Sequence, residues 1–126
     1  MKKFYFVVLL FSLSSCYKDL SLDGFDKDQW EAAIENCSNY RLDIVDLIIE
    51  NEDVILEGTQ NEVESLLGKA REHELYERNQ KFFHYRLTPP ASCGEAETVK
   101  YLSVRFNAIG RANLVQVMLR ESSVAD

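Results

Sequence analysis

Two stretches in the second half of the chain alternate apolar and polar residues, and this alternation restricts the fold more than any other feature. They are residues 81–87 (KFFHYRL) and 100–106 (KYLSVRF), and residues 112–119 (ANLVQVML) follow the second one after a short hairpin connection. Side chains of a strand point to opposite faces in turn, so the alternation predicts strands with one buried face. Pro89-Pro90 ends the first strand, because proline cannot donate to a ladder. We therefore predict a three-stranded antiparallel sheet.

Helical patterns come before the strands. Apolar residues recur at helical spacing over residues 30–37, 41–51 and 63–67, which predicts two to three helices. The last of these has clear end signals. Thr59 and Glu62 have the spacing of a capping box at its start, and Gly68 is placed to end it.

Helices followed by an antiparallel meander predict an α+β fold of two layers, with the N-terminal helices packed on one face of the three-stranded sheet. We expect a single domain over residues 29–121, because a chain of this size leaves little room for a second core. Residues 122–126 are polar and predict a frayed tail. The charged residues 69–79 predict a loop with at most a short edge strand.

The first residues of the chain have the pattern of a targeting signal. Two lysines precede an apolar run at residues 4–13, which is shorter than the roughly 20 residues of a membrane span. The run ends in Leu13-Ser14-Ser15-Cys16, which resembles the lipobox of bacterial lipoproteins. The resemblance implies a signal peptide at 1–15, acylation of Cys16, and a tether over 16–28. The alternative is an ordinary signal peptide with a chance cysteine.

Charge and the residue after Cys16 bear on localisation. Without residues 1–15 the chain has 12 basic and 21 acidic residues, a formal charge of −9. This sign disfavours nucleic acid and adhesion to anionic lipid, so the acyl chains would have to hold the protein at the membrane. Tyr17 stands where some lipoproteins carry an aspartate that resembles an inner-membrane retention signal. We expect an anchor at the outer membrane, on its periplasmic face or at the cell surface.

Cys37 and Cys93 remain when Cys16 is set aside. Outside the cytoplasm an even pair of cysteines suggests a disulfide, which would pin the first helix to the loop between two strands. Two free buried thiols are the alternative. A catalytic thiol would need a basic partner, and the local sequence supplies none.

The sequence offers no convincing catalytic or metal constellation. His73 and His84 lie near acidic residues, but the spacing of a typical metal site is absent, and solvated or locally bonded histidines explain them better. Nucleophile-elbow, phosphate-loop and dinucleotide motifs are also missing from the sequence. We therefore expect a protein that is not an enzyme, with no cofactor and no small-molecule substrate.

Aromatic residues on the predicted strands offer a surface. Alternation sends about half of them into the core and places Phe82 and Tyr101 on the opposite face. Outward aromatics on a sheet are either covered by a loop or offered to a partner. Both readings remain open at the level of the sequence.

A family resemblance follows from the order of these motifs. The helix signature Gly58-x4-Val63-x2-Leu66-Leu67-Gly68, an aromatic strand, and then Leu102-x-Val104-x-Phe106-x3-Gly110 with a final strand resemble the SmpA/OmlA (BamE-like) lipoprotein domain. The wider superfamily includes β-lactamase-inhibitor proteins. The Trp30…Cys37…Arg41 start is most similar to a group of envelope lipoproteins.

Two functions are in keeping with these observations. A lipobox on a small α+β domain without catalytic motifs favours a membrane-anchored module that binds an envelope protein through the open face of the sheet, and the resemblance implies a role in outer-membrane assembly or maintenance. The second is an inhibitor or immunity-type protein that binds an envelope enzyme. In that case Glu72, Glu74 and Glu77 would present carboxylates to a basic cleft.

Overall fold

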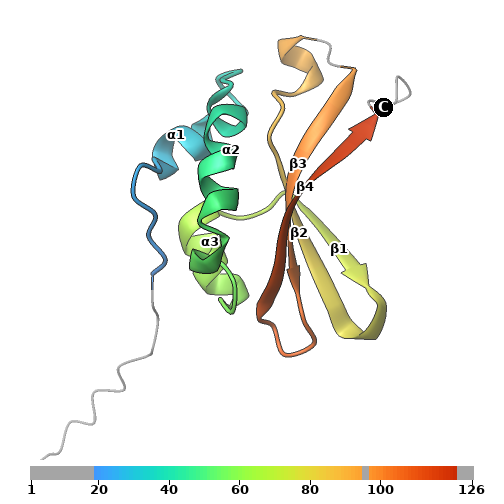
Figure 1. Ribbon diagram of the computed structural model, residues 1–126. Coiled ribbons are helices and arrows are strands. Elements are labelled where there is room, and N and C mark those ends of the chain that lie inside the picture. Colours follow the sequence, from blue (N-terminus) through green and yellow to red (C-terminus); the bar gives the residue numbers. More distant parts are fainter. Residues whose placement is uncertain (1–18, 95–96, 122–126) are drawn as a thin grey trace, which may run out of the picture.

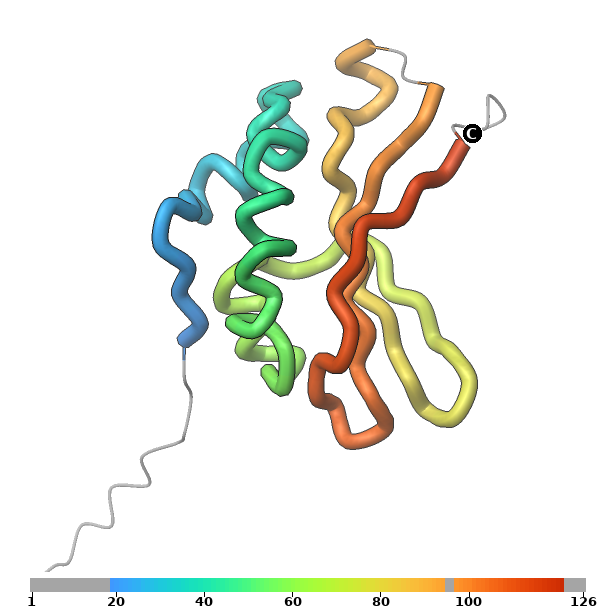
Figure 2. Tube along the Cα trace, viewed as in Figure 1, coloured from blue at the N-terminus to red at the C-terminus, as the bar shows by residue number. Residues whose placement is uncertain are grey.

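The computed structural model describes residues 19–94 and 97–121, and it has two layers (Figures 1 and 2). Three helices form one layer and a four-stranded antiparallel sheet forms the other, with strand order β1-β2-β3-β4. The elements are α1 (Lys27–Ala32), α2 (Tyr40–Glu50), α3 (Gln60–Leu67), β1 (Glu72–Tyr76), β2 (Gln80–Arg86), β3 (Thr98–Phe106) and β4 (Ala112–Glu121). The α+β class with helices on one face of the sheet is confirmed. Within the described ranges, no helix is both long and apolar enough to span a membrane.

The sheet has one strand more than predicted. β1 lies within the charged region that we expected to be mainly a loop, and it pairs with β2 from Glu72 opposite His84 to Tyr76 opposite Gln80. Nearly all of its side chains are exposed, including Leu75 at 84%. A strand with no buried face has no apolar alternation, so its pairing with β2 defines it and its sequence pattern does not.

The end signals of α3 are confirmed. Thr59 Oγ1 accepts a hydrogen bond from the Glu62 N–H at 3.2 Å, and Glu62 Oε1 accepts one from the Thr59 N–H at 3.3 Å. Gly68 follows the helix with φ +74° and ψ −176°, a conformation that favours glycine. The local sequence thus determines where the helix begins and where it ends.

Two side chains join α3 to the rest of the core. The indole Nε1–H of Trp30, on α1, donates to the Leu67 carbonyl oxygen at 2.9 Å. The hydroxyl of Tyr85, on β2, donates to the Gly68 carbonyl oxygen at 2.9 Å. Carbonyls at the end of a helix have no partner within the helix, so these bonds satisfy them and hold α1, α3 and the sheet together.

The segment before α1 corrects the predicted domain boundary. Leu20, Leu22 and Phe25 pack against the core, and the Leu20 N–H donates to Ser65 Oγ at 3.2 Å. Figure 2 shows this segment, in blue, running beside the helices. The predicted tether therefore extends too far, since its second half contributes apolar side chains to the domain. Residues 1–15, Cys16 and residues 122–126 lie outside the described residues.

The predicted disulfide joins Cys37 and Cys93, whose Cα atoms are 5.5 Å apart. α1 ends at Ala32, earlier than the predicted helix over residues 30–37, and Cys37 has a φ of +53°. Cys93 ends a short turn after β2. The bridge therefore fixes the connection between α1 and α2 to the connection between β2 and β3.

Candidate functional site

The face of the sheet opposite the helices is the first candidate surface, and we call it the outer face. All three helices pack on the other side, and no described segment lies over the outer face (Figure 1). Phe83 and Leu102 point into the core and are fully buried, so their neighbours Phe82 and Tyr101 lie on the outer face, as predicted. Both are partly exposed.

A chain of three polar side chains crosses the centre of the outer face. Ser103 Oγ lies 2.6 Å from His84 Nδ1, and His84 Nε2 lies 2.8 Å from Glu74 Oε2. They come from β3, β2 and β1 in turn. Ser103 has no exposed surface and His84 is 2% exposed, whereas the Glu74 side chain is about half exposed.

This order of hydroxyl, imidazole and carboxylate is that of a catalytic triad, but its burial does not suit one. A nucleophilic hydroxyl must reach a substrate carbonyl. Ser103 has no access to solvent, so a substrate could not reach it. The three side chains instead form a hydrogen-bonded network that holds β1, β2 and β3 together. The sequence alone did not predict this network. The strand register explains it, because His84 lies opposite Ser103 on β3 and opposite Glu72 on β1, and Glu74 is the next residue of β1 on the same face.

Aromatic and charged side chains surround this network. The Phe82 ring stacks on His84 at 5.5 Å with an interplanar angle of 6°, and Tyr76 meets Phe82 edge-on at 5.7 Å. Arg120, from β4, lies 4.8 Å above the Tyr101 ring and 2.7 Å from Glu72 Oε1. The Glu72 hydrogen bond raises the pKa of Arg120. Contacts of this kind connect all four strands across the outer face.

The three glutamates predicted to face a basic cleft have different surroundings in the structure. Glu72 pairs with Arg120 and Glu74 pairs with His84, so both carboxylates are engaged within the molecule. Glu77 is exposed in the turn between β1 and β2. The three do not form a free acidic cluster.

The two histidines are also kept apart. His73 Nε2 bonds to the Ala70 carbonyl oxygen at 2.9 Å, and its ring packs 4.5 Å from Phe83 on the helix side of the sheet. His84 lies on the outer face. Over the described part of the chain, no group of three or more His, Cys, Asp or Glu residues is arranged to hold a metal ion.

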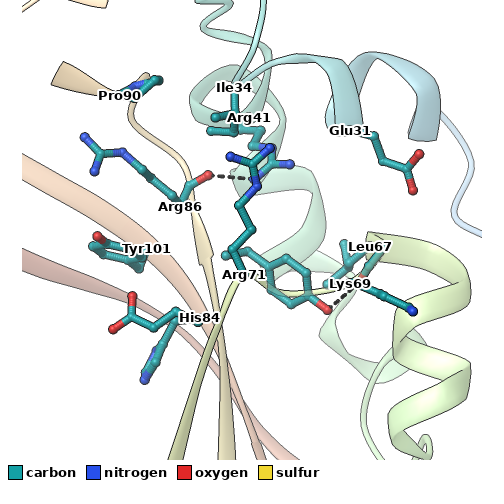
Figure 3. Close-up of a pocket in the computed structure, with 13 residues that line it drawn as sticks. Glu31, Ile34, Arg41, Leu67, Lys69, Arg71, His84, Arg86, Pro90 and Tyr101 are labelled. Atoms are coloured by element: carbon teal, nitrogen blue, oxygen red, sulfur yellow. Dashed lines mark hydrogen bonds between the residues drawn. The ribbon is translucent and has the colours of Figure 1, made fainter. Parts of the chain in front are cut away.

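A pocket of about 440 Å³ opens beside the outer face (Figure 3). Its lining includes His84 and Tyr101 from that face, and it continues past the edge of β2 to Arg41 on α2. The sequence pattern gave no sign that its basic residues form a site. They are far apart in the chain, and only the fold brings them together.

Comparison of the chain with protein-family models, with curated proteins and with solved structures found no match.

Proposed function

We propose that this protein is a lipid-anchored, non-enzymatic module of the bacterial cell envelope that binds a protein partner through the outer face of its sheet. The observation that carries the proposal is the open outer face, with Phe82 and Tyr101 partly exposed at its centre. Aromatic residues and arginine dominate the energetics of protein interfaces. The outer face offers both, since Arg120 covers Tyr101.

The outer face is also preorganised for binding. Phe82 is stacked on a fully packed His84, and Tyr101 is held by Arg120, which Glu72 fixes in turn. Ordering side chains at an interface costs about 0.5–1.5 kcal/mol each, so side chains that are already held lose less on binding. A partner could therefore bind the outer face without rearrangement of these side chains.

The anchor and the compartment rest on the lipobox at Cys16. Its resemblance to bacterial lipoproteins supports acylation, and Tyr17 supports an outer-membrane location. The resemblance of residues 54–119 to the SmpA/OmlA domain supports a role in outer-membrane assembly or maintenance. The inhibitor alternative has less support, because two of its three carboxylates are already paired within the molecule.

The outer face is tested by cross-linking in the native envelope. A photo-cross-linking residue at Gln116, on the outer face of β4, should capture a defined partner. The double variant Phe82→Ala/Tyr101→Ala should lose this product. The matched control Leu75→Ala/Ile109→Ala removes two apolar side chains that are 84% and 81% exposed and lie off the outer face, and it should retain the product. Equal capture by both double variants would remove the outer face from consideration.

The anchor is tested separately. Cys16→Ala should abolish incorporation of labelled palmitate and cleavage of the signal peptide, and fractionation of wild-type cells then locates the membrane. Palmitate incorporation by the variant equal to that of the wild type would end the lipoprotein proposal. This result would leave the binding role of the outer face untouched.

A further inference from the structure

The pocket lies beside the end of β2 that has no β1 residue paired with it. Pairing between β1 and β2 stops with Glu72 opposite His84, so Tyr85 and Arg86 have no strand partner on that edge. The Leu87 N–H bonds to Lys100 on β3, so by the alternation of an antiparallel ladder the Arg86 N–H and carbonyl face the pocket. This open edge supplies backbone polar groups to the pocket wall.

The charge of the pocket is opposite to that of the protein. Its lining includes four basic residues, Arg41, Lys69, Arg71 and Arg86, and two acidic residues, Glu31 and Glu72. Both acids have partners outside this basic set, since Glu31 lies 3.6 Å from Lys27 and Glu72 lies 2.7 Å from Arg120. Neither acid forms an ion pair with any of these four basic residues, although Glu31 attracts Arg41 weakly through space.

Arg41 is fixed in place with part of its guanidinium unused. Its Nε–H donates to the Trp30 carbonyl oxygen at 2.7 Å, and Nη1 donates to the Arg86 carbonyl oxygen at 2.9 Å. The guanidinium also lies 4.6 Å above the Trp30 ring. In the described ranges no residue accepts a hydrogen bond from Nη2. Nη2 of Arg41 is therefore a fixed hydrogen-bond donor that a ligand could use.

Arg71 brings a second free guanidinium to the same place. It is exposed, and no described residue forms an ion pair with it. Figure 3 shows the Arg41 and Arg71 guanidinium groups close together, while that of Arg86 points away. Burial and, to a smaller extent, the nearby Arg71 lower the pKa of Arg41 to about 10, so Arg41 remains charged at neutral pH. Two adjacent cations repel each other, and a bound anion would relieve this repulsion.

We propose that this pocket binds a carboxylate carried by an apolar group, with Arg71 and Arg41 as its donors. The planar fork of arginine matches the two oxygens of a carboxylate. Ile34, Leu67 and Pro90 supply apolar walls for the rest of the ligand. Inorganic phosphate has no apolar part to pack against these walls, so it suits the pocket less well. The pocket would bind such a group whether or not a protein covers the outer face.

The test uses nuclear magnetic resonance of the full chain in neutral detergent. The probes are phenylacetate, a short peptide with a free C-terminal phenylalanine, the amides of both, and inorganic phosphate. We expect phenylacetate and the free-acid peptide to shift the Nε–Hε signals of Arg41 and Arg71 in a saturable manner, and the amides to leave them unchanged. Binding of the peptide alone would assign the site to a chain terminus of a partner.

A matched pair of variants checks the assignment. Arg71→Gln should weaken carboxylate binding by about tenfold or more, because it removes charge-assisted hydrogen bonds. Arg71 is exposed, so its loss should not disturb the fold. Arg78→Gln removes one charge from the exposed turn between β1 and β2 and should leave binding unchanged. Equal shifts with acid and amide, stronger binding of phosphate than of carboxylate, or unchanged binding in Arg71→Gln would each overturn the proposal.

Discussion

Removal of a single hydroxyl from Tyr85 should destabilise the domain measurably. The Tyr85 side chain is 2% exposed, and its hydroxyl donates to the Gly68 carbonyl oxygen at 2.9 Å. Tyr85→Phe keeps the ring and its packing but leaves this buried carbonyl without its partner. An unsatisfied buried acceptor costs about 1–3 kcal/mol. Each kcal/mol lowers the melting temperature of a domain of this size by roughly 4–8 °C.

The same substitution should change how stability depends on pH. Burial raises the pKa of Tyr85 above its ordinary value of 10.0, with a further contribution from Glu64. As the pH rises above 10.0, the unfolded chain loses a proton that the folded chain keeps. The free energy of unfolding of the wild type therefore falls with rising pH in this range. Tyr85→Phe has no hydroxyl to titrate at this position. The difference in free energy of unfolding between wild type and variant should therefore be largest below pH 10.0 and should decrease as the pH rises above 10.0.

Urea unfolding followed by circular dichroism at a series of pH values measures both effects. Tyr76→Phe is the matched control, because Tyr76 is 51% exposed. The control should change the free energy of unfolding by no more than about 0.5 kcal/mol at any pH. If Tyr85→Phe lost no more than the control, or if its deficit stayed constant as the pH rose, the buried hydrogen bond would not have the role assigned to it.

Three further changes test other parts of the structure. Ser103→Ala leaves buried His84 without a partner at Nδ1 and should cost about 1–3 kcal/mol in urea unfolding, whereas a loss near zero would show that the network adds no stability. Gly68→Ala places a side chain at φ +74° and ψ −176°, and the strain should cost about 1–3 kcal/mol. An unchanged melting temperature would contradict that backbone geometry. Cys37→Ala/Cys93→Ala should lose about 4 kcal/mol by loop entropy and make residues 28–39 the first site of proteolysis. A loss below 1 kcal/mol would argue against that mechanism.

Local chemistry explains why much of the fold could be predicted. The alternation around Phe83 and Leu102 identifies β2 and β3, because each strand buries one face completely. The Thr59 capping box and Gly68 place both ends of α3, since these residues satisfy or terminate the helix on their own. Such signals act over a few neighbouring residues and need no knowledge of the rest of the chain.

The remaining features depend on pairing between distant segments. β1 buries no face, so only its register with β2 reveals it. The His84 network needs that register as well, because its three members come from three strands. The pocket exists because β1 stops at Glu72 and leaves the next residues of β2 uncovered. Predicting the position of a strand end to the residue requires the whole sheet.

The disulfide also determines how the chain carries mechanical load. It closes a loop between residues 56 positions apart, and this loop contains α2, α3, β1 and β2. α1 lies on one arm outside the loop, and β3 and β4 lie on the other. A pull on the two ends of the chain passes through the bridge, which shortens the reach of the unfolded chain by roughly 200 Å. Arg41, Arg71 and Arg86 all lie inside this loop. Tension can therefore stretch only the segments before Cys37 and after Cys93, and the disulfide keeps the segment that carries these arginines from being pulled out.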